Sequence, residues 1–178
     1  MSMSALLQRQ QGFNLLELMT VTAIVSILSL VGVPKLKPMI DRTQAKTSLS
    51  QTTTAFQLAR FSAVSAQQLV TVCPLDADNM CTTDWSNAIT VFYDPNNTRA
   101  LPSPAAIIRE FPPLPFGHMK AAPASKNYFQ YTAQGHSHGT IGHVRYCPDD
   151  DKAMARVVVN MTGRTRAEWL PDDTPLTC

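Results

Sequence analysis

The feature that most constrains this chain is a long apolar run near its start, which a single acidic residue interrupts. No charged residue lies between Leu18 and Val33, and residues 13–16 extend the apolar stretch to about 20 residues. A helix rises about 1.5 Å per residue, so a helix of about 20 residues crosses the hydrocarbon core of a bilayer. The sequence therefore predicts a transmembrane helix over residues 13–34.

The residues before this run, 1–12, form a polar leader rather than a secretory signal peptide. A signal peptide has a shorter apolar core, and its small-residue cleavage site follows that core. Here the only small-residue cut site, Gly12, precedes the core, and Arg9 favours a cytoplasmic location for this end. We therefore expect an anchor that is trimmed on its cytoplasmic side, with the rest of the chain beyond the membrane.

The start of the anchor resembles the class III signal of type IV prepilins and pseudopilins. The resemblance rests on Gly12-Phe13, on Leu16-Glu17-Leu18, on the apolar run and on Pro34 at its end. Asn14 departs from the pattern, because the family usually has threonine there. The resemblance implies that a prepilin peptidase cuts after Gly12 and methylates the new N-terminal amine of Phe13.

Glu17 stands where a charge is costly. A carboxylate inside a bilayer costs about 2.5–3.5 kcal/mol on insertion scales, so it usually has a partner or a role. The anchor contains no cation, but cleavage after Gly12 creates an ammonium group on Phe13. The resemblance implies that Glu17 meets this group on a neighbouring subunit, so that the charge is satisfied only in an assembled fibre. The alternative is an acid tolerated near the interface of an ordinary single-pass anchor.

After the anchor, residues 35–68 have the pattern of an amphipathic helix. Small and apolar residues recur at steps of three and four and form one stripe. The stripe consists of Leu49, Phe56, Ala59, Ala63 and Ala66. Pro34 and Pro38 are expected to kink or loosen the helix between anchor and stripe. The sequence thus predicts a long helix from about Phe13 to about Gln67, whose stripe packs on a sheet.

The remaining residues, 69–178, have the pattern of a β-rich globular head. Short runs rich in β-branched and aromatic residues are separated by turn residues, as in strands joined by hairpins. The candidate strands cover residues 69–73, 88–94, 107–111, 127–133, 140–147, 155–161 and 164–170. Six prolines lie between Leu101 and Lys126, so residues 101–126 are expected to be an exposed, partly extended loop. We predict an α+β fold in which one long helix packs on an antiparallel sheet.

The four cysteines, Cys73, Cys81, Cys147 and Cys178, all lie outside the anchor. If the head lies beyond the membrane, two disulfides are the simplest arrangement. The sequence favours pairing of Cys73 with Cys81 and of Cys147 with Cys178, although four cysteines allow three pairings. Four free thiols, as in a cytosolic protein, are the alternative.

The composition argues against several classes of function. A net charge of +2 does not produce a strong overall field, so binding to nucleic acid has to come from a local patch. The sequence contains no G-x-S-x-G elbow, phosphate-binding loop or H-E-x-x-H motif. No Cys/His set has the spacing of a zinc finger. We therefore expect no enzyme activity, no cofactor and no metal.

The second half of the chain resembles the FimT/GspH group of minor pilins and pseudopilins. The resemblance covers nearly the whole mature chain except residues 101–126. It extends to Gly163, Arg164 and Arg166, which are similar to the G-R-x-R signature of FimT proteins. Because FimT proteins are minor pilins implicated in DNA binding during natural transformation, the resemblance implies sequence-independent contacts to duplex DNA here.

The chemistry of this short motif suits phosphate. Gly163 is able to adopt a left-handed conformation that reverses the chain. Two residues spaced as Arg164 and Arg166 point to the same side of an extended segment, and guanidinium groups bind phosphate oxygens without reading sequence. A hairpin turn with solvated arginines is the alternative. Acidic residues near the motif repel DNA or pair with the arginines. Other cations enlarge the positively charged surface if their side chains face the same way as Arg164 and Arg166. The acids are Glu168, Asp172 and Asp173, and the further cations are Arg145, Lys152 and Arg156.

Two functions are therefore weighed. The first is a minor pilin that is held in the bacterial inner membrane with its head in the periplasm, is then built into a pilus, and binds extracellular DNA at the cell surface. The second is a structural minor pilin, or a type II secretion pseudopilin, that primes or caps the fibre without binding DNA. Both imply the same protein partners, namely other major and minor pilins, the prepilin peptidase and the pilus assembly platform.

Overall fold

The computed structural model describes residues 14–148, 152–171 and 178, apart from the side chains of residues 30–35. The chain divides into two compact units, Met1–Met39 and Ile40–Cys178, and we call the second unit the head. One long helix, α1 (Leu15–Ala66), begins in the first unit and ends in the head. The helix predicted from about Phe13 to about Gln67 agrees with these bounds.

Asn14 marks the beginning of α1. Its side-chain oxygen accepts a hydrogen bond from the backbone N–H of Leu16 at 3.3 Å, which is the role of a helix N-cap. Glu17 lies in the first turn, where the partial positive charge of the helix terminus favours a carboxylate. The span of α1 includes Pro34 and Pro38, and the kink or loosening expected at these prolines stays a prediction.

The membrane anchor expected over residues 13–34 falls within the first unit. Phe13, its first residue, lies outside the described residues. Among the residues that are described, no helix is both long enough and apolar enough to cross a membrane. The anchor stays a prediction of the sequence.

The head contains eight described strands and one short 3-10 helix, η1 (Pro104–Ala106). The strands are β1 (Val70–Pro74), β2 (Ile89–Tyr93), β3 (Ile107–Phe111), β4 (His118–Ala122), β5 (Phe129–Tyr131), β6 (Gly142–Cys147), β7 (Ala155–Val159) and β8 (Thr165–Trp169). They form two four-stranded sheets, with the orders β3-β2-β1-β5 and β4-β6-β7-β8. Every pairing is antiparallel. The α+β class is as predicted, but the strands divide between two sheets rather than forming one.

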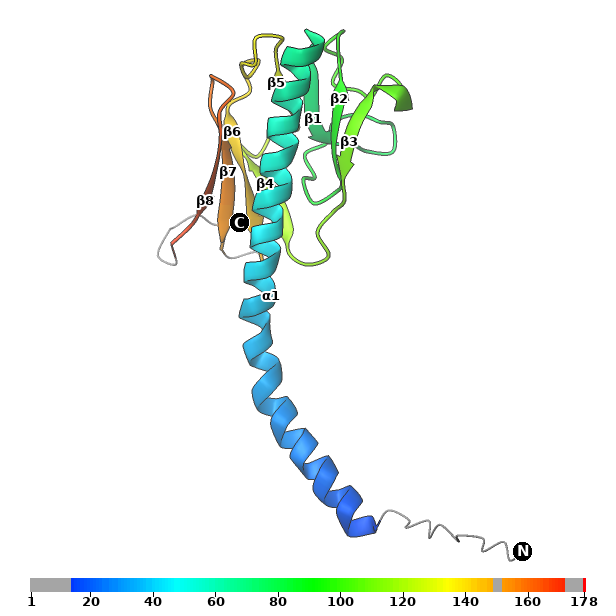
Figure 1. The fold of residues 1–178 in the computed structure, drawn as a ribbon, viewed down its shortest axis with the longest axis vertical. Helices are drawn as coiled ribbons and strands as arrows, with labels where there is room; N and C mark the ends of the chain where they lie inside the picture. The colour runs from blue at the N-terminus through cyan, green and yellow to red at the C-terminus, as the bar shows by residue number, and fades with distance from the viewer. Residues whose placement is uncertain (1–13, 149–151, 172–177) are drawn as a thin grey trace, which may run out of the picture. The chain divides into compact units, whose positions relative to one another are not determined.

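The part of α1 within the head packs against both sheets (Figure 1). Phe56 is fully buried, and its ring lies 4.9 Å from the ring of Phe129 in an edge-to-face contact. Trp85 contacts the same ring at 5.5 Å. The rest of the helix surface in the core consists mainly of small residues. The buried apolar residues of α1 are Ala45, Leu49, Ala55, Phe56, Ala59 and Ala63. The predicted stripe is thus confirmed except at Ala66, which is only partly buried.

The expectation of an exposed loop over residues 101–126 is wrong in part. β4 lies within this segment and pairs with β6, and its residues Met119 and Ala121 belong to the core. The prolines lie in the connections on either side of β3 and β4, where no ladder hydrogen bond is needed. The short strand His-Met-Lys-Ala-Ala has little β-propensity of its own, so its pairing depends on β6 rather than on its local sequence.

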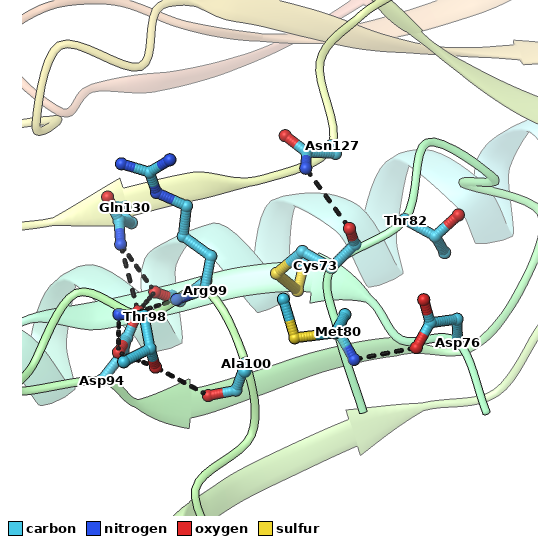
Figure 2. Close-up of a disulfide and its surroundings, with 12 residues drawn as sticks. Cys73, Asp76, Met80, Thr82, Asp94, Thr98, Arg99, Ala100, Asn127 and Gln130 are labelled. Atoms are coloured by element: carbon cyan, nitrogen blue, oxygen red, sulfur yellow. Dashed lines mark hydrogen bonds between the residues drawn. A yellow bond between two sulfur atoms is a disulfide. The ribbon is translucent and has the colours of Figure 1, made fainter. Parts of the chain in front are cut away.

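Two disulfides and a buried carboxylate fix the loops of the head. Cys73 bonds Cys81, and Cys147 bonds Cys178, which are the pairs that the sequence favoured. Asp94 is buried and accepts hydrogen bonds from the Thr71 hydroxyl at 3.0 Å and from the backbone N–H groups of Thr98 and Arg99 at 2.8 and 2.9 Å. Figure 2 shows Thr98, Arg99 and Gln130 gathered around this carboxylate, near the Cys73 disulfide. These donors satisfy the buried charge.

The head contains what it needs to fold on its own. Its core cluster runs from Ala45 to Val159, and both disulfides join residues of the same unit. No residue of Met1–Met39 is part of the described core. Experiments on residues 40–178 alone are therefore justified.

Candidate nucleic-acid interface

The turn between β7 and β8 carries the motif that the sequence singled out. The N–H of Asn160 donates to the carbonyl of Arg164 at 3.2 Å, and the N–H of Gly163 donates to the carbonyl of Asn160 at 3.0 Å. The side-chain oxygen of Asn160 accepts the N–H of Arg164 at 2.9 Å and the hydroxyl of Thr162 at 2.9 Å. Asn160 therefore organises the turn from its first residue.

Gly163 has the left-handed backbone conformation that the sequence predicted, with φ of +74°. It is buried, and a Cβ at this position would collide with the carbonyl oxygen of Gly135. The hydroxyl of Ser137 donates to the carbonyl of Asn160 at 2.9 Å, which ties the turn to the same underlying loop. Gly163 thus allows the turn to pack against the loop of Gly135. Its role in the proposed site is to fix the position of Arg164.

The two arginines next to Gly163 share one shallow depression on the surface. The depression has a volume of about 300 Å³ and is lined by Val158, Asn160, Arg164, Thr165 and Arg166. Arg164 is exposed, and its guanidinium group has no hydrogen bond or ion pair with any described residue. The side chain of Arg166 is 74% exposed. The turn therefore presents two guanidinium groups to solvent from a fixed position.

Glu168 is the acid nearest to these arginines among the described residues. One carboxylate oxygen pairs with Arg166 at 2.5 Å, and the other pairs with Arg156 at 2.7 Å. The hydrogen bond from Arg156 and the positive charges of both arginines lower the pKa of Glu168. The acid therefore stays ionised at neutral pH and competes with any external anion for both groups. Asp172 and Asp173, the other acids that the sequence noted, lie outside the described residues.

The structure also decides which further cations face the same way. Along β7, burial alternates strictly, with Val157 in the core and Arg156 on the opposite face. Arg145 of β6 is the direct cross-strand partner of Arg156. Lys152 precedes β7 and belongs to no strand. Of the three cations that the sequence left open, two therefore lie on the outer face of the second sheet.

Sequence reasoning missed Lys120, which is the partner of Arg145 on β4. The cause is that the six prolines of residues 101–126 predict a loop, whereas only the long-range pairing of β4 with β6 brings Lys120 into the sheet. His143 lies on the same face of β6 as Arg145, and the positive charges there affect its pKa. Its pKa is lowered by burial and by the positive charges of Arg156 and Arg145.

The residues predicted for processing and assembly are not tested by the geometry. Gly12 and Phe13 lie outside the described residues. Glu17 is exposed, and its carboxylate makes no hydrogen bond or ion pair with any residue that the structure describes.

One cluster has the residue types of a metal site. The side-chain donor atoms of His118, Cys147 and Cys178 lie within 4.8 Å of one another. Both sulfur atoms belong to a disulfide, so neither is a thiolate, which is the form that binds metal. This cluster is therefore no support for a metal centre.

Comparisons with known proteins address the fold and the family. A family model described as "Type II transport protein GspH" matches residues 49–163. Two crystal structures of the type IV minor pilin FimU from Pseudomonas aeruginosa have the same fold. One is 18% identical, with a TM-score of 0.57, and the match covers 75% of this chain and 98% of FimU. The other is 16% identical, with a TM-score of 0.58 and coverage of 79% and 99%. No curated protein matches the chain.

The position of Gly163 generates a stability prediction. Gly163→Ala is expected to lower the free energy of unfolding of the head by about 2–4 kcal/mol, because it combines an unfavourable left-handed conformation with a clash against backbone. Gly139 is the matched control, since it also has a positive φ but has open space around it. Gly139→Ala should cost only about 1–2 kcal/mol. Urea denaturation of both variants measures the difference, and equal losses would show that the turn does not depend on this contact.

Proposed function

Because the chain belongs to the GspH family of type II transport proteins, we propose that it is a minor pilin that binds DNA. In this proposal the protein is built into a type IV pilus and captures extracellular duplex DNA for uptake in natural transformation. The contact is made by Arg164 and Arg166, and it does not depend on DNA sequence.

The observation that carries the proposal is the fixed turn with two solvent-facing guanidinium groups above one depression. Arginine forms paired hydrogen bonds to phosphate oxygens, and contacts to phosphate position DNA without reading its bases. A receptor for arbitrary DNA needs that property. With two to four phosphate contacts, the dissociation constant is expected to be of order 10⁻⁴–10⁻⁶ M and to rise steeply with salt.

The proposal includes the path to the fibre. The precursor is held in the inner membrane by residues 13–34, with the head in the periplasm, and is cut after Gly12. The ammonium group of Phe13 then pairs with Glu17 of a neighbouring subunit when the pilus assembly platform moves the protein into the fibre. The exposure of Glu17, and its lack of a partner among the described residues, support an external partner for this carboxylate.

A second function has its own supporting observation. The family model carries the description of a transport protein, and its match ends at Gly163, one residue before Arg164. The matched part of the chain therefore lacks both arginines of the proposed site. A structural minor pilin or type II secretion pseudopilin, which primes or caps a fibre without binding DNA, is the alternative.

The two functions differ in what the arginines do. Arg164→Ala combined with Arg166→Ala is expected to abolish the binding of residues 40–178 to random duplex DNA, because both phosphate contacts are lost. Gel-shift titration at several salt concentrations measures this binding. In cells, the same double variant should reduce transformation while pili remain on the surface.

The control for this experiment is Arg109→Ala, which removes an exposed arginine from β3 in the other sheet. It should bind DNA as the parent does. A double variant that retains parental affinity rejects the assignment of the motif. A parent that shows no affinity at low salt, with pili lost on deletion of the chain, favours the structural function.

The pairing of Glu17 predicts a defect in assembly that is separate from DNA binding. Glu17→Val removes the carboxylate, so the variant should be inserted and cut normally but should enter fibres poorly, because its helix no longer attracts the ammonium group of its neighbour. Immunoblots of sheared pili measure incorporation, and mass spectrometry of the N-terminus measures cleavage. Normal incorporation of this variant would contradict the pairing.

A further inference from the structure

The outer face of the second sheet carries a row of cations that runs across the strands. Lys120 on β4 is opposite Arg145 on β6, and Arg145 is opposite Arg156 on β7. Neighbouring strands lie about 4.8 Å apart, so the three cations follow one another at this spacing. Their sequence neighbours Ala121, Val144 and Val157 belong to the core, which places the cations on the face away from α1.

This arrangement is unfavourable for the sheet by itself. Like charges on directly opposite residues destabilise a pair of strands, and here the row holds two such pairs in succession. Arg145, at the centre, has no hydrogen bond or ion pair with any residue that the structure describes, and its Nε atom is buried. The lowered pKa of the adjacent His143 has positive charge as one of its causes. Two members of the row have partners within the head, because the ammonium group of Lys120 donates to the carbonyl of Cys178 at 2.8 Å and Arg156 pairs with Glu168. Arg145 is therefore the member of the row whose charge favours an anion from outside the sheet.

The row is continuous with the depression at the β7–β8 turn. On β8, Glu168 is the partner of Arg156, and Arg166 is the partner of Val158 two register positions along, on the same face of the sheet. Glu168 holds Arg156 with one oxygen and Arg166 with the other. The acid therefore joins the row to the turn and at the same time neutralises part of both.

We propose that the outer face of the second sheet is a track for the phosphates of duplex DNA, in which Arg145 is the central contact and Glu168 is an internal competitor. The track begins at Arg164 and Arg166 and continues over β7 to Arg145 on β6. Lys120 on β4, whose ammonium group donates to the carbonyl of Cys178, lies at the far edge of the track. DNA carries one negative charge per about 1.7 Å of its axis, so one duplex supplies phosphates over the whole width of the sheet. This inference rests on the proposed function and extends its site beyond the turn.

The role of Glu168 follows from its two ion pairs. A phosphate that binds Arg156 or Arg166 has to replace a carboxylate oxygen or to bind beside a fixed negative charge. Glutamine has the same shape as glutamate without the charge. Glu168→Gln is therefore expected to leave the β7–β8 hairpin in place. The variant should bind DNA more tightly than the parent, whereas most substitutions in a binding site weaken binding.

The test measures the fluorescence anisotropy of labelled random duplex DNA with residues 40–178 at several salt concentrations. Arg145→Gln should weaken binding about eightfold near 0.1 M salt and lower the slope of log K against log salt by about 0.9, because one phosphate contact is lost. Glu168→Gln should tighten binding about two- to fivefold, the equivalent of one exposed ion pair. Arg109→Gln, an exposed arginine of the first sheet, is the matched charge control and should bind as the parent does.

Each other outcome overturns the inference. If Arg145→Gln keeps parental affinity while the Arg164/Arg166 double variant loses it, the track is wrong and the proposed function stands. If the parent does not bind at all, both fail. If Arg109→Gln weakens binding as much as Arg145→Gln does, the effect reports net charge alone, and the track is wrong. If Arg145→Gln does not fold, Glu168→Gln decides, since affinity equal to or below that of the parent rejects the competitor and the track with it.

Discussion

The register of β6, β7 and β8 is the constraint on which the rest of the head depends. Side chains alternate between the two faces of a strand, so one register sends Val144 and Val157 into the core and Arg145 and Arg156 to the outside. A slip of one residue would exchange the two sets and bury the cations. The core and the charged surface are therefore specified together, and the packing of the head determines where its positive charge appears.

The helix imposes the second constraint. In the head, α1 contributes mostly alanines to the core, with Phe56 as its one large aromatic residue there. The ring of Phe56 packs edge-to-face on Phe129, which Trp85 contacts as well. These contacts use the inner face of the second sheet, so that Lys120, Arg145 and Arg156 lie half-buried on its outer face. The turn at Gly163, which rests on Gly135, continues that face to Arg164.

Local features of the fold were predictable from the sequence, whereas features that depend on distant pairing were not. The helix and most strands follow from periodicity, and the two disulfides are the pairs that the sequence favoured among three possible pairings. The division into two sheets, β4 and the place of Lys120 depend on a pairing with β6 that no local pattern encodes. The motif at Arg164 and Arg166 was visible in the sequence. The clash that makes Gly163 structural was not, since it involves the carbonyl of Gly135 from another loop.

The central claim is that one face of the head, defined by the register of its second sheet, binds DNA. The most direct measurement is an NMR titration of isotopically labelled residues 40–178 with a short random duplex. The account predicts that signals of Lys120, Arg145 and Arg156 shift together with those of Arg164 and Arg166, while Arg109 and its neighbours on β3 stay unchanged. Shifts that gather on the first sheet, or shifts confined to the turn, would contradict it.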